Sequence, residues 1–148
     1  MRADKLTTKF QQALADAQSL ALANDAGFIE PAHLLSALLD QPDGGSASLL
    51  SRAGANVAAL KKGVQEAISR LPKVEGTGGE MTVSRDLGNL LNLADKEASK
   101  RGDQFIASEL FLLACAGEKG DTGRLLKQHG ATAAALEKAI QAVRGGQG

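Results

Sequence analysis

Residues 28–39 read FIEPAHLLSALL, and residues 105–116 read FIASELFLLACA. Both stretches open with Phe-Ile, pass through a short linking segment and end in an apolar run with helical spacing. The likeness extends upstream at a constant offset of about 77 residues, where an apolar stripe of Phe10, Leu14, Ala17 and Ala21 returns as Leu87, Leu91, Ala94 and Ala98. This regular recurrence indicates an internal duplication.

The downstream part of each half repeats as well. LLSRAGANVAALKKGVQ, from Leu49, corresponds to LLKQHGATAAALEKAIQ, from Leu125, after a deletion of one residue. Each copy has a glycine suited to end one helix and an Asn or Thr suited to cap the next. A four-helix unit of about 65 residues is too small to bury its apolar faces well alone. We therefore expect the two halves to pack together with pseudo-twofold symmetry.

The expected fold class is all-α, because apolar residues recur at helical spacing and no stretch alternates long enough for a strand. Two pseudo-twofold-related four-helix repeats would pack into one eight-helix domain covering residues 1–148. Repeat one is expected at about 5–71 and repeat two at about 82–144. The Gly-rich segment 72–81 is expected to be an exposed connector, and residues 145–148 the start of a linker.

The composition argues against several classes of function. The 17 basic and 17 acidic side chains cancel, and the only aromatic residues are four Phe. The sequence therefore has neither the basic excess nor the many aromatic residues that nucleic-acid binding uses. The longest apolar runs fall short of the roughly 20 residues of a membrane helix. The start lacks the apolar segment of a secretory signal, and one cysteine cannot form an internal disulfide. We expect a cytoplasmic protein with no nucleic-acid or membrane partner.

Residues suited to catalysis or metal binding are few. His33 and His129 lie far apart and outside HExxH spacing, and we read them as a helix-start and a helix-end residue. Cys115 lies within LLACAG, where a small buried thiol is an ordinary core residue. The segment GEKGDTGR lacks the Gly-Lys-Ser/Thr of a phosphate-binding loop. A non-catalytic domain without a metal or a cofactor is predicted; a stand-alone enzyme would have only Cys115 and the two histidines to use.

The two halves differ in polarity at one place. The second copy carries Asp103, Glu109 and Leu110 where the first carries Ala26, Ala32 and His33. A duplication preserves the positions that a shared core needs, so a departure in one copy marks a candidate for a task that only that half performs.

Two interpretations of these positions stay open. Glu109 would lie in the first turn of a helix capped by Ser108, where a carboxylate is stabilising, and Asp103 could be a turn residue after Gly102. Alternatively, the carboxylates form the rim of a groove whose apolar floor includes Leu91 and Leu110. These two leucines would then be half-exposed, whereas apolar residues at helical spacing are most often core. Such a groove would suit an unfolded segment that is both basic and apolar.

The residues quoted above carry a family resemblance. The paired stretches, with the opening KLTTKFQQALADAQSLA, the connector RLPKVEGTGGE and the ending VRGGQG, resemble the Clp N-terminal repeat domain of the AAA+ protein unfoldases. Within that family they are most similar to the ClpB-type disaggregases, which are stress-response chaperones. The connector and the RGG exit favour these over relatives that feed the ClpP protease. The resemblance covers essentially the whole chain.

The resemblance implies a role. In full-length family members a flexible linker joins this domain to a homohexameric ring with two ATPase modules per subunit, which uses ATP and Mg²⁺ and works with the DnaK chaperone system. The domain helps to capture unfolded or aggregated polypeptide. None of the ATPase motifs occurs in this sequence, so we expect a non-catalytic domain, monomeric when isolated. The alternative is an adaptor-docking domain of the ClpA or ClpC type.

The resemblance also implies a site. The family's substrate-contact positions fall on Thr7, Asp103 and Glu109, beside an apolar groove that includes Leu91 and Leu110. Thr7 is explained equally well as a helix cap. His33 takes the place of Leu110 in the first half, which implies a more polar surface there and argues against a second, symmetric groove.

Overall fold

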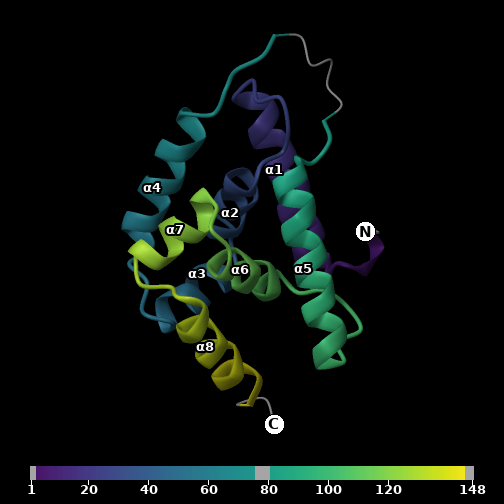
Figure 1. Cartoon of the computed structure of the whole chain (residues 1–148), viewed down its shortest axis with the longest axis vertical. Coiled ribbons are helices and arrows are strands. Elements are labelled where there is room, and N and C mark those ends of the chain that lie inside the picture. The colour runs from purple at the N-terminus through teal and green to yellow at the C-terminus, as the bar shows by residue number, and fades with distance from the viewer. Residues whose placement is uncertain (1–2, 76–80, 146–148) are drawn as a thin grey trace.

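The computed structural model describes residues 3–75 and 81–145, which form helices joined by short turns (Figure 1). A short 3-10 helix, Ala3–Lys5, precedes eight α-helices in these residues: α1 (Thr8–Ala23), α2 (Pro31–Leu39), α3 (Gly45–Arg52), α4 (Val57–Ser69), α5 (Arg85–Arg101), α6 (Ser108–Gly117), α7 (Asp121–Gln128) and α8 (Ala133–Gly145). The predicted all-α architecture is confirmed. Parts of the predicted connector and linker, residues 76–80 and 146–148, lie outside the described residues.

Side-chain caps fix the starts of equivalent helices. The hydroxyl of Thr7 accepts a hydrogen bond from the backbone N–H three residues later at 3.2 Å, and the hydroxyl of Ser84 does the same in the second repeat at 3.1 Å. The prediction for α6 is wrong in one detail. Ser108 is the first helical residue, and Ala107, in the capping position, has no side chain that could cap. Glu109 lies in the first turn as expected.

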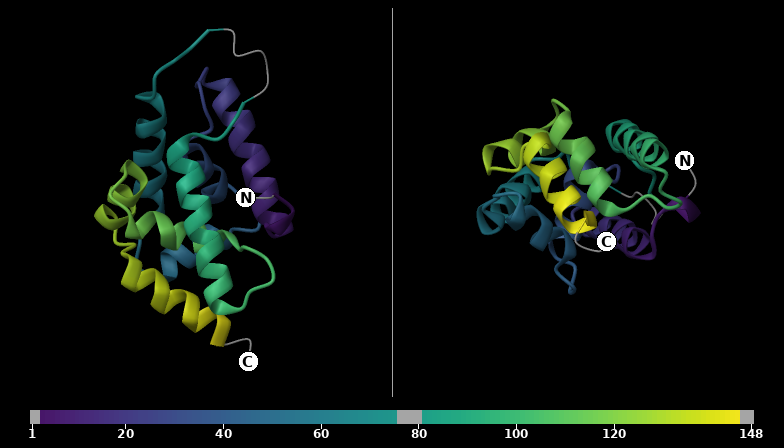
Figure 2. Two further views of the ribbon diagram at one scale, coloured as in Figure 1. Left: turned by 45° about the vertical axis from the view of Figure 1, so that its right-hand side comes forward. Right: turned by 90° about the horizontal axis from the view of Figure 1, so that it is seen from below.

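Helix packing follows the predicted pseudo-twofold relation. α1 packs on α2 as α5 packs on α6, and α2 packs on α4 as α6 packs on α8. Between the repeats, α3 packs on α8 and α4 packs on α7, and these two contacts exchange when the repeats are exchanged. In Figure 1 and in the left view of Figure 2, α8 lies at the lower end of the molecule, and the last residues of α4 lie toward the upper end.

Each repeat also contributes a short segment to the other. Leu6, before α1, forms a parallel bridge with Ile106, before α6, and Val83, before α5, forms one with Ile29, before α2. The two bridges map onto each other at the offset of about 77 residues. The start of each repeat is thereby fixed beside the other repeat's loop.

Two equivalent glycine turns meet between the repeats. Gly54 and Gly130 adopt φ values of 105° and 101°, a region that favours glycine. A Cβ on Gly130 would lie 2.7 Å from the carbonyl oxygen of Gly54, so no side chain fits there. The backbone N–H of Asn56 donates to the carbonyl of His129 at 3.0 Å across the same contact.

One hydrophobic core runs through both repeats. The rings of Phe10 and Phe111 lie 6.1 Å apart between centroids, and the equivalent leucines Leu35 and Leu112 have no exposed surface. Leu14, expected in the core stripe of α1, is only partly buried. In the part of the chain that the structure describes, no helix has the length and apolar character needed to cross a membrane.

Candidate functional site

The structure brings Thr7 next to the loop that carries Asp103. The backbone N–H of Thr7 donates to the carbonyl of Ile106 at 3.1 Å, and the N–H of Ile106 donates to the carbonyl of Lys5 at 2.8 Å. Asp103 precedes Ile106 in this loop, and Glu109 follows it in the first turn of α6. Thr7 and the loop of repeat two that carries Asp103 are therefore held together by a backbone bridge. The hydroxyl of Thr7 caps α1.

Both carboxylates of this region bind Arg144, in the last turn of α8. Its Nη1 and Nη2 atoms donate to the two oxygens of Asp103 at 3.0 and 2.9 Å, and its Nε donates to Glu109 at 3.0 Å. The hydrogen bonds that Arg144 donates to Asp103, and then to Glu109, raise the pKa of Arg144 above its usual range. The three side chains are 32%, 22% and 27% exposed in the order Arg144, Asp103, Glu109, so this ion cluster lies at the surface of the fold.

We call the positions of Asp103, Glu109 and Arg144, and the three equivalent positions of repeat one, the corner of each repeat. In repeat one the corner consists of apolar residues. Buried Leu60, Val64 and Ile68 lie along α4, and Leu136, Ile140 and Arg144 occupy the equivalent places along α8. Ala26, Ala32 and Ile68 are all buried in repeat one, where repeat two has Asp103, Glu109 and Arg144. Three apolar residues thus correspond to one complete ion cluster.

Sequence reasoning found the two acids but missed Arg144. Arg144 is expected only as the last residue of repeat two, directly before the linker, although the helical spacing of α8 predicts a core residue at this position. Aligning the two halves as far as Ile68 would have revealed a basic residue at the position of a core isoleucine.

An apolar groove lies between α5 and α6. It has a volume of about 280 Å³ and is lined by Leu93, Glu97, Leu110, Leu113, Ala114, Gly117 and Glu118. Leu110 lies at its base with no exposed surface of its own, and Leu93 is 37% exposed. Leu91, 4% exposed, faces the core and does not line the groove. Of the two alternatives for Leu91 and Leu110, half-exposed or core, the structure has the core one, and Leu93 is the accessible leucine of α5.

Phe105 adds a second exposed apolar group. It is 47% exposed in the loop between Asp103 and Glu109, and its repeat-one equivalent, Phe28, is 52% exposed. His33 has no exposed surface, so the expectation that it makes the first repeat's surface more polar is wrong.

The residues considered for catalysis lie in ordinary structural settings. Burial raises the pKa of the Cys115 thiol to about 12, which leaves it protonated and unreactive at neutral pH. Burial lowers the pKa of His33, whose Nδ1 accepts a hydrogen bond from the backbone N–H of Glu30 at 2.9 Å. His129 follows α7 as its C-cap residue. Within residues 3–75 and 81–145, no group of His, Cys, Asp or Glu has an arrangement that could hold a metal ion.

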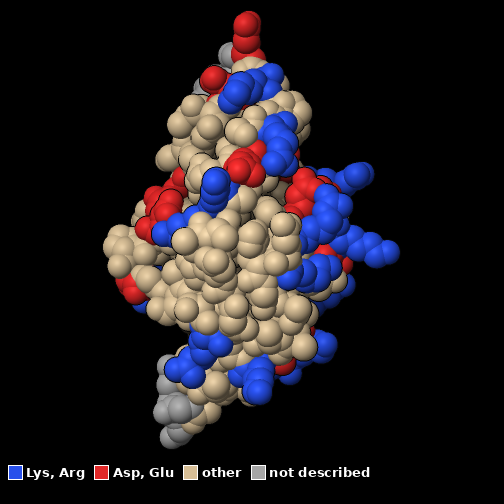
Figure 3. Space-filling view, turned by 90° about the vertical axis from the view of Figure 1, so that its left-hand side faces the viewer, with Lys and Arg blue, Asp and Glu red and all other residues tan. Residues whose placement is uncertain are grey.

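Charged side chains of both signs border one face of the molecule. Figure 3 shows this face, on the side of α4 and α7 in Figure 1, with blue and red side chains intermingled toward its ends and margins and a broad uncharged area between them. The balanced charge of the sequence is thus also mixed in space on this face.

The sequence and the fold both match known proteins. The family description "Clp repeat (R) N-terminal domain" matches residues 5–129. The chaperone protein ClpB of Vibrio cholerae is 48% identical over 147 residues, which are 99% of this chain and 17% of that protein. The chain therefore spans about a sixth of the length of the curated relatives it matches.

Solved structures show the same fold at low identity. The Hsp104 N-terminal domain from Candida albicans has a TM-score of 0.82 at 20% identity, covering 95% of this chain and 92% of that one. A complex of a ClpV N-domain with a VipB peptide has a TM-score of 0.75 at 24% identity, covering 94% and 86%. With the duplication, the eight helices and these matches together, the chain belongs to the Clp repeat N-terminal domain family and is a homologue of the N-terminal domain of ClpB chaperones.

Proposed function

We propose that this chain is the substrate-recognising N-terminal domain of a ClpB-type disaggregase, which binds unfolded or aggregated polypeptide and passes it to the ATPase ring. One observation carries the proposal: exposed apolar side chains and carboxylates are present together in repeat two. Leu93 lines the α5–α6 groove and is partly exposed, and Phe105 is half-exposed. Asp103 and Glu109 lie on either side of Phe105 in the sequence. Unfolded chains expose apolar residues that folded proteins bury.

The charge of this region suits a basic segment. One guanidinium, that of Arg144, lies between the two carboxylates of Asp103 and Glu109, which leaves one net negative charge. A Lys or Arg of the bound segment would be attracted there, and its apolar neighbours would enter the α5–α6 groove. Thr7 and Leu110 are the proposed contacts at the edge and the base, and Leu91 would support the groove from the core side.

The domain would act by weak capture. A flexible linker that keeps a bound segment near the ring raises its local concentration there, so a weak interaction is sufficient. The domain itself would be non-catalytic and monomeric. The homohexamer, ATP and Mg²⁺ binding, and cooperation with the DnaK system in the cytoplasm would belong to the full-length protein. The complex of a ClpV N-domain with a VipB peptide supports the idea that this fold can bind a peptide.

An NMR titration tests the proposal. The domain is titrated with a permanently reduced, carboxymethylated model protein and, separately, with the same protein folded, while the amides of Thr7, Leu91, Asp103, Glu109 and Leu110 are followed. We expect concentration-dependent shifts at these amides with the unfolded protein alone. Absence of binding to the unfolded protein, combined with tight stoichiometric binding to a folded adaptor, would replace the proposal with adaptor docking.

A further inference from the structure

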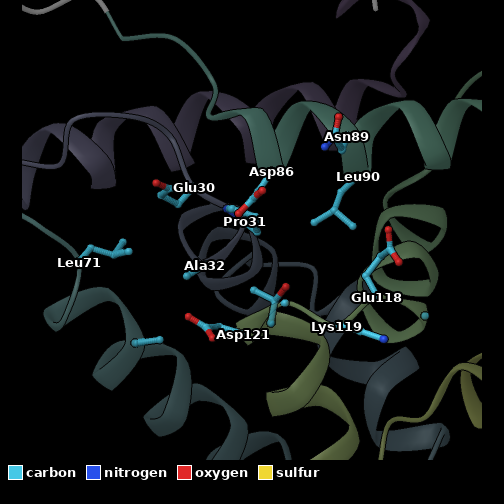
Figure 4. A pocket seen from close by; sticks show the side chains of 14 residues that line it. Glu30, Pro31, Ala32, Leu71, Asp86, Asn89, Leu90, Glu118, Lys119 and Asp121 are labelled. Atoms are coloured by element: carbon cyan, nitrogen blue, oxygen red, sulfur yellow. The ribbon is translucent and has the colours of Figure 1, made fainter.

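A larger groove lies between the two repeats, apart from the ion cluster. It has a volume of about 550 Å³, within the range of ligand sites in proteins. Its walls are the start of α2, the end of α4, the first turns of α5 and the loop between α6 and α7 (Figure 4). The groove is therefore built by both repeats and depends on their packing.

The groove has apolar side chains on several walls. Leu90 of α5 points into it in Figure 4, and Leu71 reaches it from the end of α4. Pro31, Ala32 and Ala67 complete the apolar lining. Small residues on α2 and α4 leave the space open, so a side chain from another molecule could bury its apolar surface there.

Carboxylates surround this apolar lining. Glu30, Asp86, Glu118 and Asp121 line the groove, and Lys119 is the one basic residue among its described lining residues (Figure 4). Asp121 pairs with Arg124. Among the described residues, neither Asp86 nor Glu118 forms an ion pair or a hydrogen bond through its carboxylate.

Helix stabilisation explains some of these acids but not Glu118. Asp86 and Asp121 lie in the first turns of their helices and Glu30 precedes α2, places where a carboxylate is favoured. Glu118 is the C-cap residue of α6, at the negative end of that helix, where a carboxylate is disfavoured. The end of α6 therefore does not account for this carboxylate.

The loop that carries Glu118 is held closely in place. A Cβ on Gly123 would lie 2.4 Å from the carbonyl oxygens of both Cys115 and Glu118, so α7 can approach the end of α6 only because residue 123 is glycine. Gly117 and Glu118 line both this groove and the α5–α6 groove. The two grooves thus share one rigid margin.

We propose that the groove between the repeats is a second polypeptide-binding site, which takes an apolar side chain flanked by Lys or Arg in an unfolded segment. Charge complementarity selects this occupant, since four carboxylates and one ammonium group surround an apolar floor. The shared margin at Glu118 lets one extended segment continue from the α5–α6 groove into this one. The inference rests on the proposed function, because it names a further site for the same class of substrate.

Short fluorescent peptides with matched sequences test this site. One has a Lys-Leu-Phe-Lys centre, a second has Glu in place of both Lys, and a third has Ser in place of Leu and Phe. Binding is measured by anisotropy to the parent domain, to the Asp86→Asn/Glu118→Gln variant, and to Asp16→Asn/Asp25→Asn as a control. The control removes the same charge from exposed positions outside both grooves.

The groove variant should bind the Lys-Leu-Phe-Lys peptide about tenfold more weakly at low salt, because two attractive charges are lost. The control should bind within about twofold of the parent, since surface charges away from the contact add little. The Glu and Ser peptides should bind poorly to all forms, and amide shifts should include Asp86, Asn89 and Glu118.

Two results would overturn the inference in different ways. If the peptide binds, but shifts are confined to Thr7, Asp103 and Glu109, the second site does not exist and the proposed function stands. This holds whatever the affinity of the groove variant, because Glu118 also lines the α5–α6 groove. If no peptide and no unfolded protein binds the parent domain, both proposals fail together.

Discussion

Two equivalent corners of this domain are built from opposite kinds of residue. Repeat one fills its corner with Ala26, Ala32 and Ile68, and repeat two places Asp103, Glu109 and Arg144 at the same positions. Both corners belong to the same fold, so folding does not require the charges. Apolar replacements of ion pairs are often neutral or stabilising, and the charged version therefore calls for an explanation other than stability.

The two corners also differ in their surroundings. The end of α8 is fixed to α6 through Arg144, whereas the corresponding end of α4 lines the open groove between the repeats through Ala67. Duplication has thus produced two repeats with the same arrangement of helices and different surfaces.

The largest effect is expected from the shared core, where the comparison predicts no difference between repeats. Leu35→Ala and Leu112→Ala each remove a fully buried leucine from the same core, and each should lower the free energy of unfolding by about 2–5 kcal/mol. Chemical denaturation followed by circular dichroism gives both values. Leu93→Ala, at an exposed position, is the control and should cost less than about 1 kcal/mol. Separate unfolding transitions for the two repeats would contradict a single core.

A smaller loss is expected from Arg144→Ala, which leaves Asp103 and Glu109 facing each other without their counter-charge. We expect about 1–2 kcal/mol of destabilisation, reduced for partial exposure and lessened further by salt. Arg70→Ala, at the equivalent end of α4, is the control and should cost less than about 0.5 kcal/mol, because its pair with Glu66 is exposed. Equal losses in the two variants would show that the ion cluster contributes no more than a surface pair.

A pH effect of smaller size is expected from His33, which occupies the position of Leu110. Burial lowers the pKa of His33 in the folded state, so below the ordinary value of 6.5 the unfolded chain binds more protons than the folded one. The contribution of neutral His33 to stability should therefore be lost as the pH falls from 6.5 toward the lowered pKa. Protonation of Nδ1 would also remove the hydrogen bond from Glu30.

His33→Leu measures this contribution directly, since it gives repeat one the side chain that repeat two already has. The free energy of unfolding of the variant minus that of the parent should increase as the pH is lowered through this window, because only the parent loses the contribution of His33. Parallel pH profiles for the two proteins would mean that His33 does not titrate differently in the folded and unfolded states.

The helical fold could be read from the sequence because its signals are local or repeated. The caps at Thr7 and Asn56 use short-range geometry, and each forms the expected hydrogen bond. The duplication also predicted the symmetric packing, because equivalent apolar faces need equivalent partners. The prediction that Ser108 caps α6 is wrong, because the surrounding sequence does not distinguish a serine at the cap from a serine at the first helical position.

The site was predicted less completely, because burial and charge pairing depend on distant contacts. Asp103 and Glu109 were found from the difference between repeats, but their partner lies 41 and 35 residues away in the chain. Leu91 and Leu93 lie two positions apart on α5, and helical spacing alone did not decide which one reaches the surface. The groove between the repeats exists only when both halves are packed.

The most direct test of the account exchanges one corner for the other. The triple variant Asp103→Ala/Glu109→Ala/Arg144→Ile gives repeat two the residues of repeat one, and its free energy of unfolding and its affinity for an unfolded, carboxymethylated model protein are measured side by side with the parent. We predict a free energy of unfolding equal to or higher than that of the parent, with affinity for the unfolded protein about tenfold weaker at low salt. A variant that binds the unfolded protein as well as the parent, or that is much less stable, would contradict the claim that these charges serve binding rather than folding.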